Sequence, residues 1–500
     1  MTFYTRRDLM QGIGVALGTP LSLTRAQSEV TPRILRFQPE MEPLVALIEA
    51  APRQKCAEMV VGQLRRGVSY RQLMGALFLA GVRNVNPRPP GFALHCVFII
   101  HSAHLISMEA PDDVRLLPLF HALDHFKASQ ERDAKQEGGD YTMRAHTGRV
   151  PEGGRALSEF TAAMEAWDSE RAELAVSGLA RSIGPADVFE MMWQYGARDY
   201  RNIGHKAIFV ANASRTLGAM GWQYAEPVLR AMVLGLLDFG REKQVNGYGF
   251  EDQCYTGNRK RMNETFGRLP ATWSAEPGGE ATPRMVQTMR TATPEEACAE
   301  ATNLLLKGQA SAGAIWDAVH LSAAELMIRA RGAAGIAGIH AVTSANALHH
   351  AWLASSKQST RFLILLQAVG WMVQFLKFSQ SREENLRKVW LTEMEPSSEP
   401  VPAVEIFNSL GTDAAAAGLM RLARDAEARQ KFLAAALRYT AAKSDEVHHY
   451  KFLAALIEDL GLVSPPWQPY VIAAMPYYLK GPKDKETEGI GRAREALRTL

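Results

Sequence analysis

Apolar residues recur at α-helical spacing along most of the chain. Between residues 44 and 82 they fall three and four positions apart, as Val60 and Leu64 do, which places them on one face of a helix. Runs rich in alanine and leucine, the strongest helix formers, follow at 159–181, 300–332, 413–442 and 447–461. The alternation typical of strands is scarce. The pattern predicts an all-α protein.

Two stretches break this pattern and predict long surface loops near 129–157 and 245–284, because glycines cluster in both. The second stretch is also aromatic, which suits a lid or a binding segment, and an ordinary insertion is the alternative. Residues 27–475 are expected to form the helical domain, and 476–500 a charged C-terminal tail.

Residues 1–26 resemble a twin-arginine signal peptide. Arg6 and Arg7 precede an apolar stretch from Gly12 to Leu23, which is shorter than the roughly 20 residues of a membrane-spanning helix. We expect cleavage after Ala26, export to the periplasm or beyond by the twin-arginine translocase, and no membrane association afterwards. A basic N-terminal tail is the alternative.

Composition and motifs exclude several classes of function. Lys and Arg total 56 against 53 Asp and Glu, and a net charge of +3 argues against a nucleic-acid partner. The four cysteines form no CxxC pair. HExxH, GxSxG, Walker and GxGxxG motifs are also missing from the expected mature chain. A catalytic or metal site therefore has to be built from residues outside these motifs.

A histidine-centred pattern occurs three times. A glycine precedes a histidine, an apolar helix follows, and a second apolar helix comes about 30 residues later; the three histidines are His95, His205 and His340. A degenerate fourth copy spans 444–451 and contains His448. The pattern predicts helical-hairpin repeats that form a bundle or a short solenoid.

A closed bundle would bring the four histidines to a common point. Neutral imidazole is a frequent ligand of iron, copper and zinc, and bundle interiors commonly hold such ions. We therefore expect a transition metal or a haem held by residues drawn from His95, His101, His205, His340 and His448. The alternative is that these histidines are structural remnants of a duplication.

Basic residues near the repeats are candidates for orienting an anion. Lys206 and Arg198 are predicted to act this way, with Arg83 as a further cation, and His104 is a candidate base. Ordinary ion pairing, for instance with Asp199, is the alternative for each cation.

Two segments, Ile339–Leu348 and Asp445–Lys451, are similar to signatures of the questin oxidase-like family, and Ile99–Leu105 resembles its N-terminal histidine segment. The resemblance covers short islands and leaves open whether His448 or His449 is the equivalent position. It implies Baeyer–Villiger-type cleavage of aromatic rings with NADPH. Export argues against NADPH here, because that reductant is held in the cytoplasm.

Together these features predict an exported metal- or haem-dependent oxidoreductase that acts on a small cyclic or aromatic organic substrate. A metal-dependent hydrolase of a lactone or ester would use the same ligands. A helical-repeat binding protein without catalytic activity is the third possibility.

Overall fold

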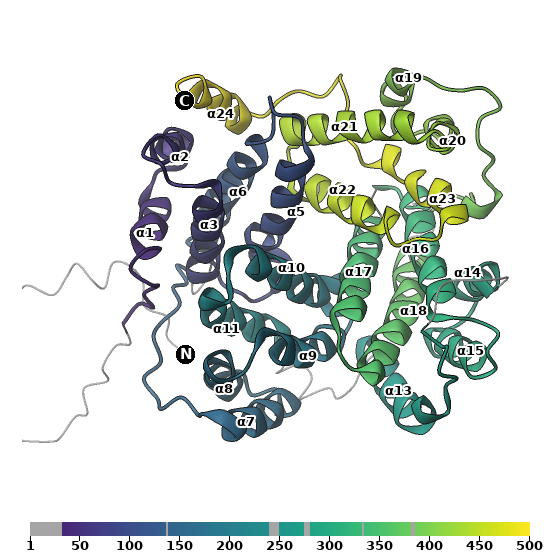
Figure 1. The fold of residues 1–500 in the computed structure, drawn as a ribbon, viewed down its shortest axis with the longest axis horizontal. Helices are drawn as coiled ribbons and strands as arrows, with labels where there is room; N and C mark the ends of the chain where they lie inside the picture. The colour runs from purple at the N-terminus through teal and green to yellow at the C-terminus, as the bar shows by residue number, and fades with distance from the viewer. Residues whose placement is uncertain (1–32, 137–138, 240–249, 275–280, 333–334, 382–385) are drawn as a thin grey trace, which may run out of the picture.

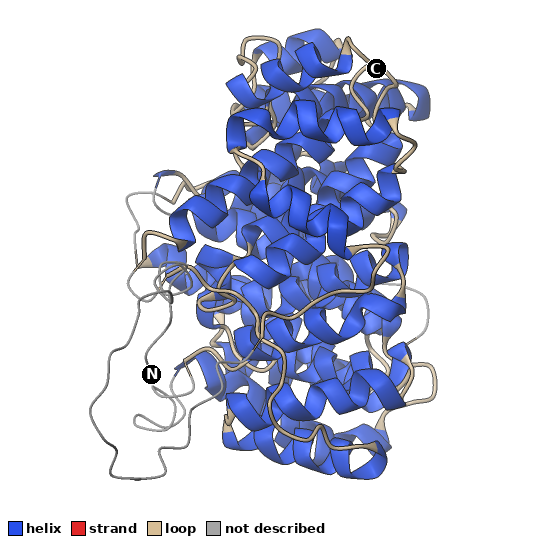
Figure 2. Cartoon of the chain, turned by 90° about the vertical axis from the view of Figure 1, so that its left-hand side faces the viewer, coloured by secondary structure: helices blue, strands red, loops and turns tan. Residues whose placement is uncertain are grey.

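The computed structural model describes residues 33–500 apart from 137–138, 240–249, 275–280, 333–334 and 382–385. The predicted signal peptide, residues 1–26, lies outside the described residues. The described chain is all-α, as predicted. Its only strand-like pairings are two isolated bridges, Ile34 with Arg144 and Ala330 with Leu386, and Figure 2 shows helices in every layer of the molecule.

Four helices that begin near the repeat histidines form the centre of the protein (Figure 1). They are α5 (His95–Glu109), α10 (His205–Met220), α17 (Gly335–Ala354) and α22 (Val447–Leu460). Helix α5 packs against α10 and α22, and α17 packs against the same two. The four helices therefore close a ring, although they come from widely separated parts of the sequence.

The predicted helical hairpins are present in the first three copies. The return helices are α6 (Leu117–Asp133), α11 (Ala225–Leu236) and α18 (Gln358–Gln380). Helix α18 is long and apolar enough to cross a membrane, but 89% of its most apolar window is buried inside the protein. It serves as the packing partner of α17 and α16 (Ala312–Arg329) in the core.

The remaining helices enclose this centre. Before α5 come α1 (Glu42–Ala50), α2 (Cys56–Arg65), α3 (Tyr70–Asn84) and α4 (Pro90–Ala93). Before α10 come α7 (Gly153–Ala166), α8 (Ser169–Ser182) and α9 (Pro185–Gly196), and before α16 come α14 (Ala281–Thr291) and α15 (Pro294–Leu306). The C-terminal part adds α19 (Ala403–Asn408), α20 (Asp413–Leu422), α21 (Ala426–Lys443) and α23 (Gln468–Ile472).

Of the loop predicted over 245–284, residues 250–274 and 281–284 are described, and most of them are helical, so the prediction is wrong there. Residues 245–249 and 275–280 lie outside the described residues. Helix α13 (Phe250–Thr265) occupies the middle of the predicted loop. Packing overrides the weak helix propensity of this segment, because α13 lies against α18 and α15. Gly370 of α18 permits the contact, since a Cβ there would clash with the Cys254 sulfur. The other predicted loop is shorter than 129–157, because α6 ends at Asp133 and α7 begins at Gly153.

The C-terminal residues are folded onto the body of the protein. Helix α24 (Glu488–Leu497) packs against α6 and α2, and Arg492 lies 3.3 Å from the Asp124 carboxylate of α6. The predicted charged tail, 476–500, thus contains a docked amphipathic helix.

Candidate metal centre

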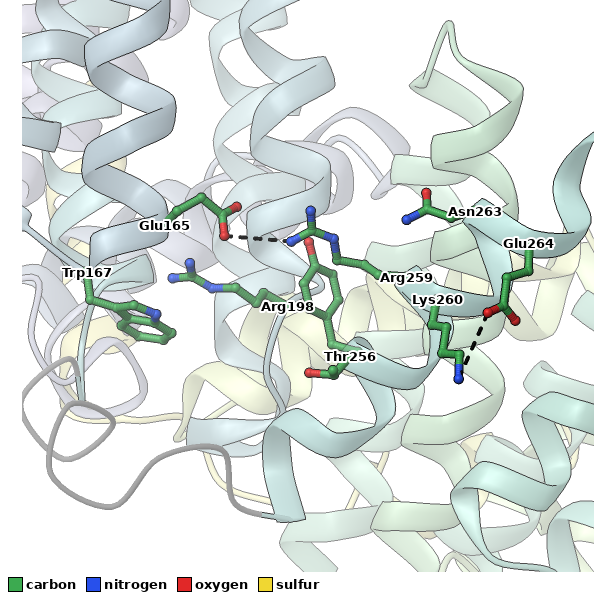
Figure 3. Close-up of a pocket in the computed structure, with 9 residues that line it drawn as sticks. Glu165, Trp167, Arg198, Thr256, Arg259, Lys260, Asn263 and Glu264 are labelled. Carbon is green, nitrogen blue, oxygen red and sulfur yellow. Dashed lines mark ion pairs between the residues drawn. The ribbon is translucent and has the colours of Figure 1, made fainter.

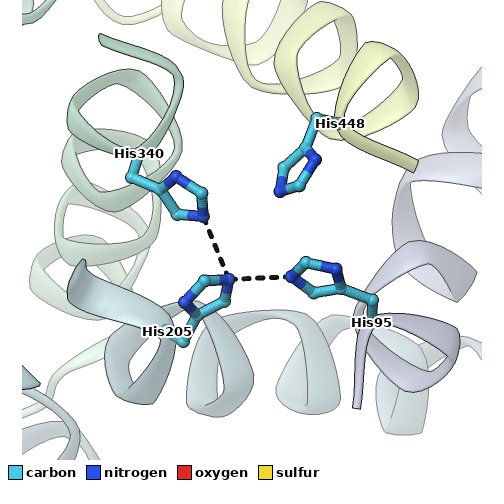
Figure 4. A group of neighbouring side chains, drawn as sticks. All are labelled: His95, His205, His340 and His448. Atoms are coloured by element: carbon cyan, nitrogen blue, oxygen red, sulfur yellow. Dashed lines mark hydrogen bonds between the residues drawn. The ribbon is translucent and has the colours of Figure 1, made fainter. Parts of the chain in front are cut away.

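Each central helix presents one histidine to a common point at its N-terminal end (Figure 4). His95 and His205 are the first residues of α5 and α10, His448 is the second residue of α22, and His340 lies in the second turn of α17. Their candidate ligand atoms all lie within 4.8 Å of one another. The structure therefore brings together four of the five histidines predicted as ligands, and the group could hold a metal ion.

The four rings follow one another around the central point. Ring centroids lie 5.0 Å apart for His95 and His205, and 4.4 Å apart for His205 and His340. They lie 5.1 Å apart for His340 and His448, and 4.8 Å apart for His448 and His95. The Nε2 atom of His205 is 2.8 Å from that of His95 and 3.0 Å from that of His340.

Three of the rings have their outer nitrogen fixed by a hydrogen-bond acceptor. The Nδ1 atom of His205 lies 2.6 Å from the Asn202 carbonyl oxygen, and that of His340 lies 2.7 Å from the Ile336 carbonyl oxygen. The Nδ1 atom of His448 lies 2.9 Å from the Glu446 carboxylate. A ring nitrogen facing such an acceptor carries hydrogen, so a neutral ring keeps its lone pair on Nε2.

This arrangement directs the Nε2 lone pairs of the cluster histidines toward one another. Neutral His205 and His340 rings cannot form a hydrogen bond through Nε2 atoms that both lack hydrogen, although these atoms are 3.0 Å apart. The Nε2 atom of His448 is buried and has no hydrogen-bond partner in the described chain. A cation bound between the four Nε2 atoms would accept a lone pair from each of them. Such a set of neutral nitrogen donors is what a transition-metal site requires.

Burial keeps these imidazoles neutral. It lowers the pKa of His95, His205 and His340 well below the ordinary value, and it lowers the pKa of His448 to about 2. The positive charge of Lys451 adds to the effect at all four rings. Protons therefore do not compete for the lone pairs near neutral pH.

Lys451 was not predicted from the sequence, and it is the most unusual side chain beside the cluster. It is 2% exposed, and its amine has no hydrogen-bond partner within the described residues. Burial lowers the pKa of this amine to about 7. Lys451 lies one helical turn after His448, and that i, i+3 spacing is the signal that could have identified it.

Glu446 was also missed. It precedes α22, and its two carboxylate oxygens bond the His448 ring and the Tyr478 hydroxyl. Tyr478 stacks on His449 with ring centroids 4.7 Å apart. The structure thus puts His448 in the cluster and His449 outside it, with the C-terminal segment supporting both.

A left-handed turn delivers His205 to the cluster. Asn202, Ile203 and Gly204 all have positive φ, at 58°, 48° and 84°. Two consecutive non-glycine residues in this region carry strain, which is typically stored at functional sites. The turn also aligns the Asn202 carbonyl oxygen with the His205 ring.

The other predicted site residues lie outside the cluster. His101 donates from Nε2 to Glu458, 3.0 Å away, and His104 stacks on Tyr70. The amine of Lys206 lies 2.8 Å from the Asp199 carboxylate, and both side chains are fully buried. Arg83 is held by Glu42 and Glu49, whereas Arg198 lies over the Trp167 ring.

A second polar layer crosses the same four helices. Glu458 of α22 accepts hydrogen bonds from His101 of α5, Arg215 of α10 and Asn346 of α17, at 2.8 to 3.0 Å. Each of these residues follows its helix's cluster histidine by six to ten positions. The central helices therefore run in the same direction away from the histidines.

Comparisons with family models, curated proteins and solved structures found no match to this chain.

Proposed function

We propose that the protein is an exported oxidoreductase that uses a single transition-metal ion and acts on a small cyclic or aromatic organic substrate. One observation carries the metal part of the proposal. Four neutral imidazoles, three of them buried and that of His95 half-buried, direct Nε2 atoms at one point, within 4.8 Å of one another, while the Nδ1 atoms of three of them are fixed by acceptors.

The number of ligands favours redox chemistry over hydrolysis. Four protein ligands complete the tetrahedral shell of zinc, whereas catalytic zinc sites keep a position open for water. Iron and copper take additional or differently arranged ligands, so four imidazoles leave room for a reactant. A hydrolase based on zinc-bound water is therefore the weaker candidate.

The spacing of the rings favours an ion over a haem. If a haem were bound, at most two of the imidazoles could hold its iron, and the porphyrin ring would keep the other two far from those. The ring centroids instead lie 4.4 to 5.1 Å apart around the whole circle. The space between four rings this close together fits a single ion and not a porphyrin.

The chain's own residues hold the site in one geometry. A redox-active metal bound here would pass electrons between an oxidant and the organic substrate. Asn202, Ile336 and Glu446 fix the ring orientations, and Phe98 lies against the rings of His95 and His205, which helps exclude water. The Lys451 amine adds a buried group of pKa about 7 that can carry or release a proton.

The resemblance to the questin oxidase-like family supports the substrate class. Two of the segments that carry it contain His340 and His448, and both of these histidines belong to the cluster. The proposal of export rests on the paired arginines near the N-terminus.

Metal analysis of protein purified through its native export route, together with an absorption spectrum, tests the proposal. About one equivalent of iron or copper with a ligand-field or charge-transfer band is expected. Stoichiometric, colourless zinc would support the hydrolase instead. A folded protein that binds none of these ions would leave a helical-repeat binding protein.

A further inference from the structure

Two of the four cysteines meet between α13 and α15. The sulfur of Cys254 on α13 lies 3.8 Å from that of Cys298 on α15, and both residues are buried. The other two cysteines bond elsewhere: the Cys56 thiol donates to a backbone carbonyl oxygen, and the Cys96 thiol bonds to the Ser129 side chain. No local sequence pattern reveals the pair, because 44 positions separate its members.

The distance between the two sulfurs suits a disulfide bond. Bonded sulfurs lie about 2.05 Å apart, so about 1.8 Å of the observed 3.8 Å has to close, and rotation of both side chains can supply this movement. Helices α13 and α15 pack against each other, and both pack against α18. A Cβ on Gly370 of α18 would clash with the Cys254 sulfur and lie 3.3 Å from that of Cys298. The glycine therefore leaves room for both sulfurs against α18.

Formation of the bond removes two hydrogen-bond donors and leaves the surrounding donors with their partners. The Cys298 thiol donates to the Leu366 carbonyl oxygen at 3.2 Å, so the hydrogen of the Cys254 thiol is directed at the Cys298 sulfur. Oxidation removes these two S–H hydrogens. The Asn258 amide nitrogen lies 3.3 and 3.5 Å from the two sulfurs and keeps its hydrogen bond of 2.8 Å to the Gln367 side chain. The surroundings therefore accept either redox state.

The two thiols differ in acidity. Burial raises the pKa of the Cys298 thiol, but hydrogen bonds with Cys254 and Asn258 and the positive charge of Arg261 outweigh burial and lower this pKa overall. The hydrogen bond to Cys298 and burial both raise the pKa of the Cys254 thiol. Because the thiolate is the nucleophile in thiol–disulfide exchange, Cys298 is the sulfur that reacts first.

Local opening of α13 gives an oxidant access to the buried sulfurs. Of residues 254–265 of this helix, three are buried, namely Cys254, Tyr255 and Asn258. A helix with so few buried contacts detaches at a lower free energy than the whole protein unfolds. An oxidant therefore has a route to both sulfurs without global unfolding.

We propose that Cys254 and Cys298 form a disulfide bond that ties α13 to α15. The Cys298 thiolate attacks a small disulfide oxidant, such as oxidised glutathione, which releases one thiol and leaves a mixed disulfide on Cys298. The Cys254 thiol then loses its proton and attacks the Cys298 sulfur, which forms the new bond and releases the second thiol. Two cysteine thiols are oxidised, and one oxidant disulfide is reduced to two thiols.

The bond fixes one wall of a pocket. One face of α13 lines this pocket of about 460 Å³, together with the end of α7 and the turn after α9 (Figure 3). Tyr255 and Thr256 directly follow Cys254 and line the pocket, as does Arg259 one turn later. Glu165 on the opposite wall lies 3.6 Å from Arg259. A disulfide at Cys254 therefore holds the helix that carries these residues.

Thiol counting on the purified full-length chain tests the bond. The protein is incubated with reduced or oxidised glutathione, unfolded in acid, labelled with N-ethylmaleimide and weighed by mass spectrometry. Since the chain has four cysteines, we expect four labels on the reduced protein and two on the oxidised protein. The two remaining labels should lie on Cys56 and Cys96. Four labels after oxidation, or lasting glutathione adducts on Cys254 or Cys298, would overturn the proposal.

Serine variants identify the two partners. Cys254→Ser and Cys298→Ser should each form no intramolecular disulfide in oxidised glutathione, because the remaining sulfur has lost its partner. Cys56→Ser is the matched control, since Cys56 is also buried but does not contact this pair. It should still form the bond and fall from three labels to one. An intramolecular disulfide in Cys254→Ser would show that Cys298 pairs with another cysteine and would overturn the assignment.

Hydrogen exchange tests whether the bond holds α13. Amide exchange in α13 should be at least about tenfold slower in the oxidised protein than in the reduced protein, because the bond opposes local opening. Helix α24, which packs against α6 and α2, is the internal control, and its exchange should not change. Equal exchange of α13 in the two redox states would contradict the proposed tie to α15.

The source of the protein separates this proposal from the proposed export, which would supply the oxidising surroundings that the bond needs in the cell. Protein recovered through the native export route should carry two labels without added oxidant, and the same chain kept in the cytoplasm should carry four. A bond that forms in oxidised glutathione but is missing from the recovered protein would support the cysteine pair and count against export. The histidine cluster contains no cysteine, so the metal proposal is tested independently.

Discussion

His101 of α5 donates a hydrogen bond to Glu458 of α22 across 3.0 Å, beneath the histidine cluster. Glu458 also forms an ion pair with Arg215, whose Nη2 atom lies 2.8 Å from its carboxylate. Burial of the Glu458 carboxyl raises its pKa, but these partners outweigh burial and lower the pKa to about 2. The ionised carboxylate therefore ties three of the central helices to α22.

We expect Glu458→Gln to lower the free energy of unfolding by about 2–3 kcal/mol at pH 7, because it removes the charge from a half-buried ion pair. Because the pKa of Glu458 is lower in the folded state, its stabilisation is present above pH 4.5 and is lost as the pH falls toward 2. Denaturant unfolding at several pH values measures both effects.

Glu427→Gln is the matched control, since Glu427 forms an exposed pair with Lys431. The control should change the unfolding free energy by less than about 1 kcal/mol. A pH dependence identical in wild type and Glu458→Gln would contradict the assigned role of Glu458.

Single-histidine variants should separate metal binding from folding. We expect His205→Ala and His340→Ala each to reduce metal content strongly while the far-ultraviolet circular dichroism stays near that of the wild type. His349→Ala is the comparison, because His349 lies on the same helix as His340 but contacts Trp316 and His320. This variant should keep its metal, and a loss equal to that in His340→Ala would argue against the cluster as the site.

Metal affinity should rise with pH between about 6 and 8. The buried amine of Lys451 has a pKa of about 7, so it loses its positive charge in this interval and stops repelling a cation. The cluster histidines do not contribute, since burial keeps them neutral at lower pH.

Competition with a chelator across this pH range measures the slope. Lys451→Arg keeps the charge at every pH, so it should weaken metal binding and flatten the dependence near pH 7. A slope unchanged in Lys451→Arg would show that another group titrates.

The sequence predicted the repeat and the meeting of its histidines at one point, because one histidine recurs near the start of each central helix. It could not assign ligands within a helix without geometry. His101 follows His95 by six positions, which displaces it about 9 Å along the helix and roughly 120° around it. The two rings therefore cannot share one ion, and His101 meets Glu458 instead.

Other features depend on contacts between distant segments that no local pattern reveals. Lys206 is adjacent to His205, but its side chain points to Asp199 and Asp238 rather than to the cluster. Helix α13 forms despite its weak propensity, because Gly370 lets it approach α18 closely.

The glycine before His205 should be essential for the geometry of the cluster. Gly204 has a φ of 84°, and a Cβ at this position would clash with the Ser344 hydroxyl of α17. Gly204→Ala should therefore cost more than the roughly 1 kcal/mol of a left-handed alanine alone and should displace the His205 ring, lowering metal content. Gly218→Ala on the same helix is the control, because a Cβ there meets nothing within 4 Å. That variant should raise the free energy of unfolding by about 0.4–1 kcal/mol with metal content unchanged, and equal metal content in the two variants would show that the turn does not position His205.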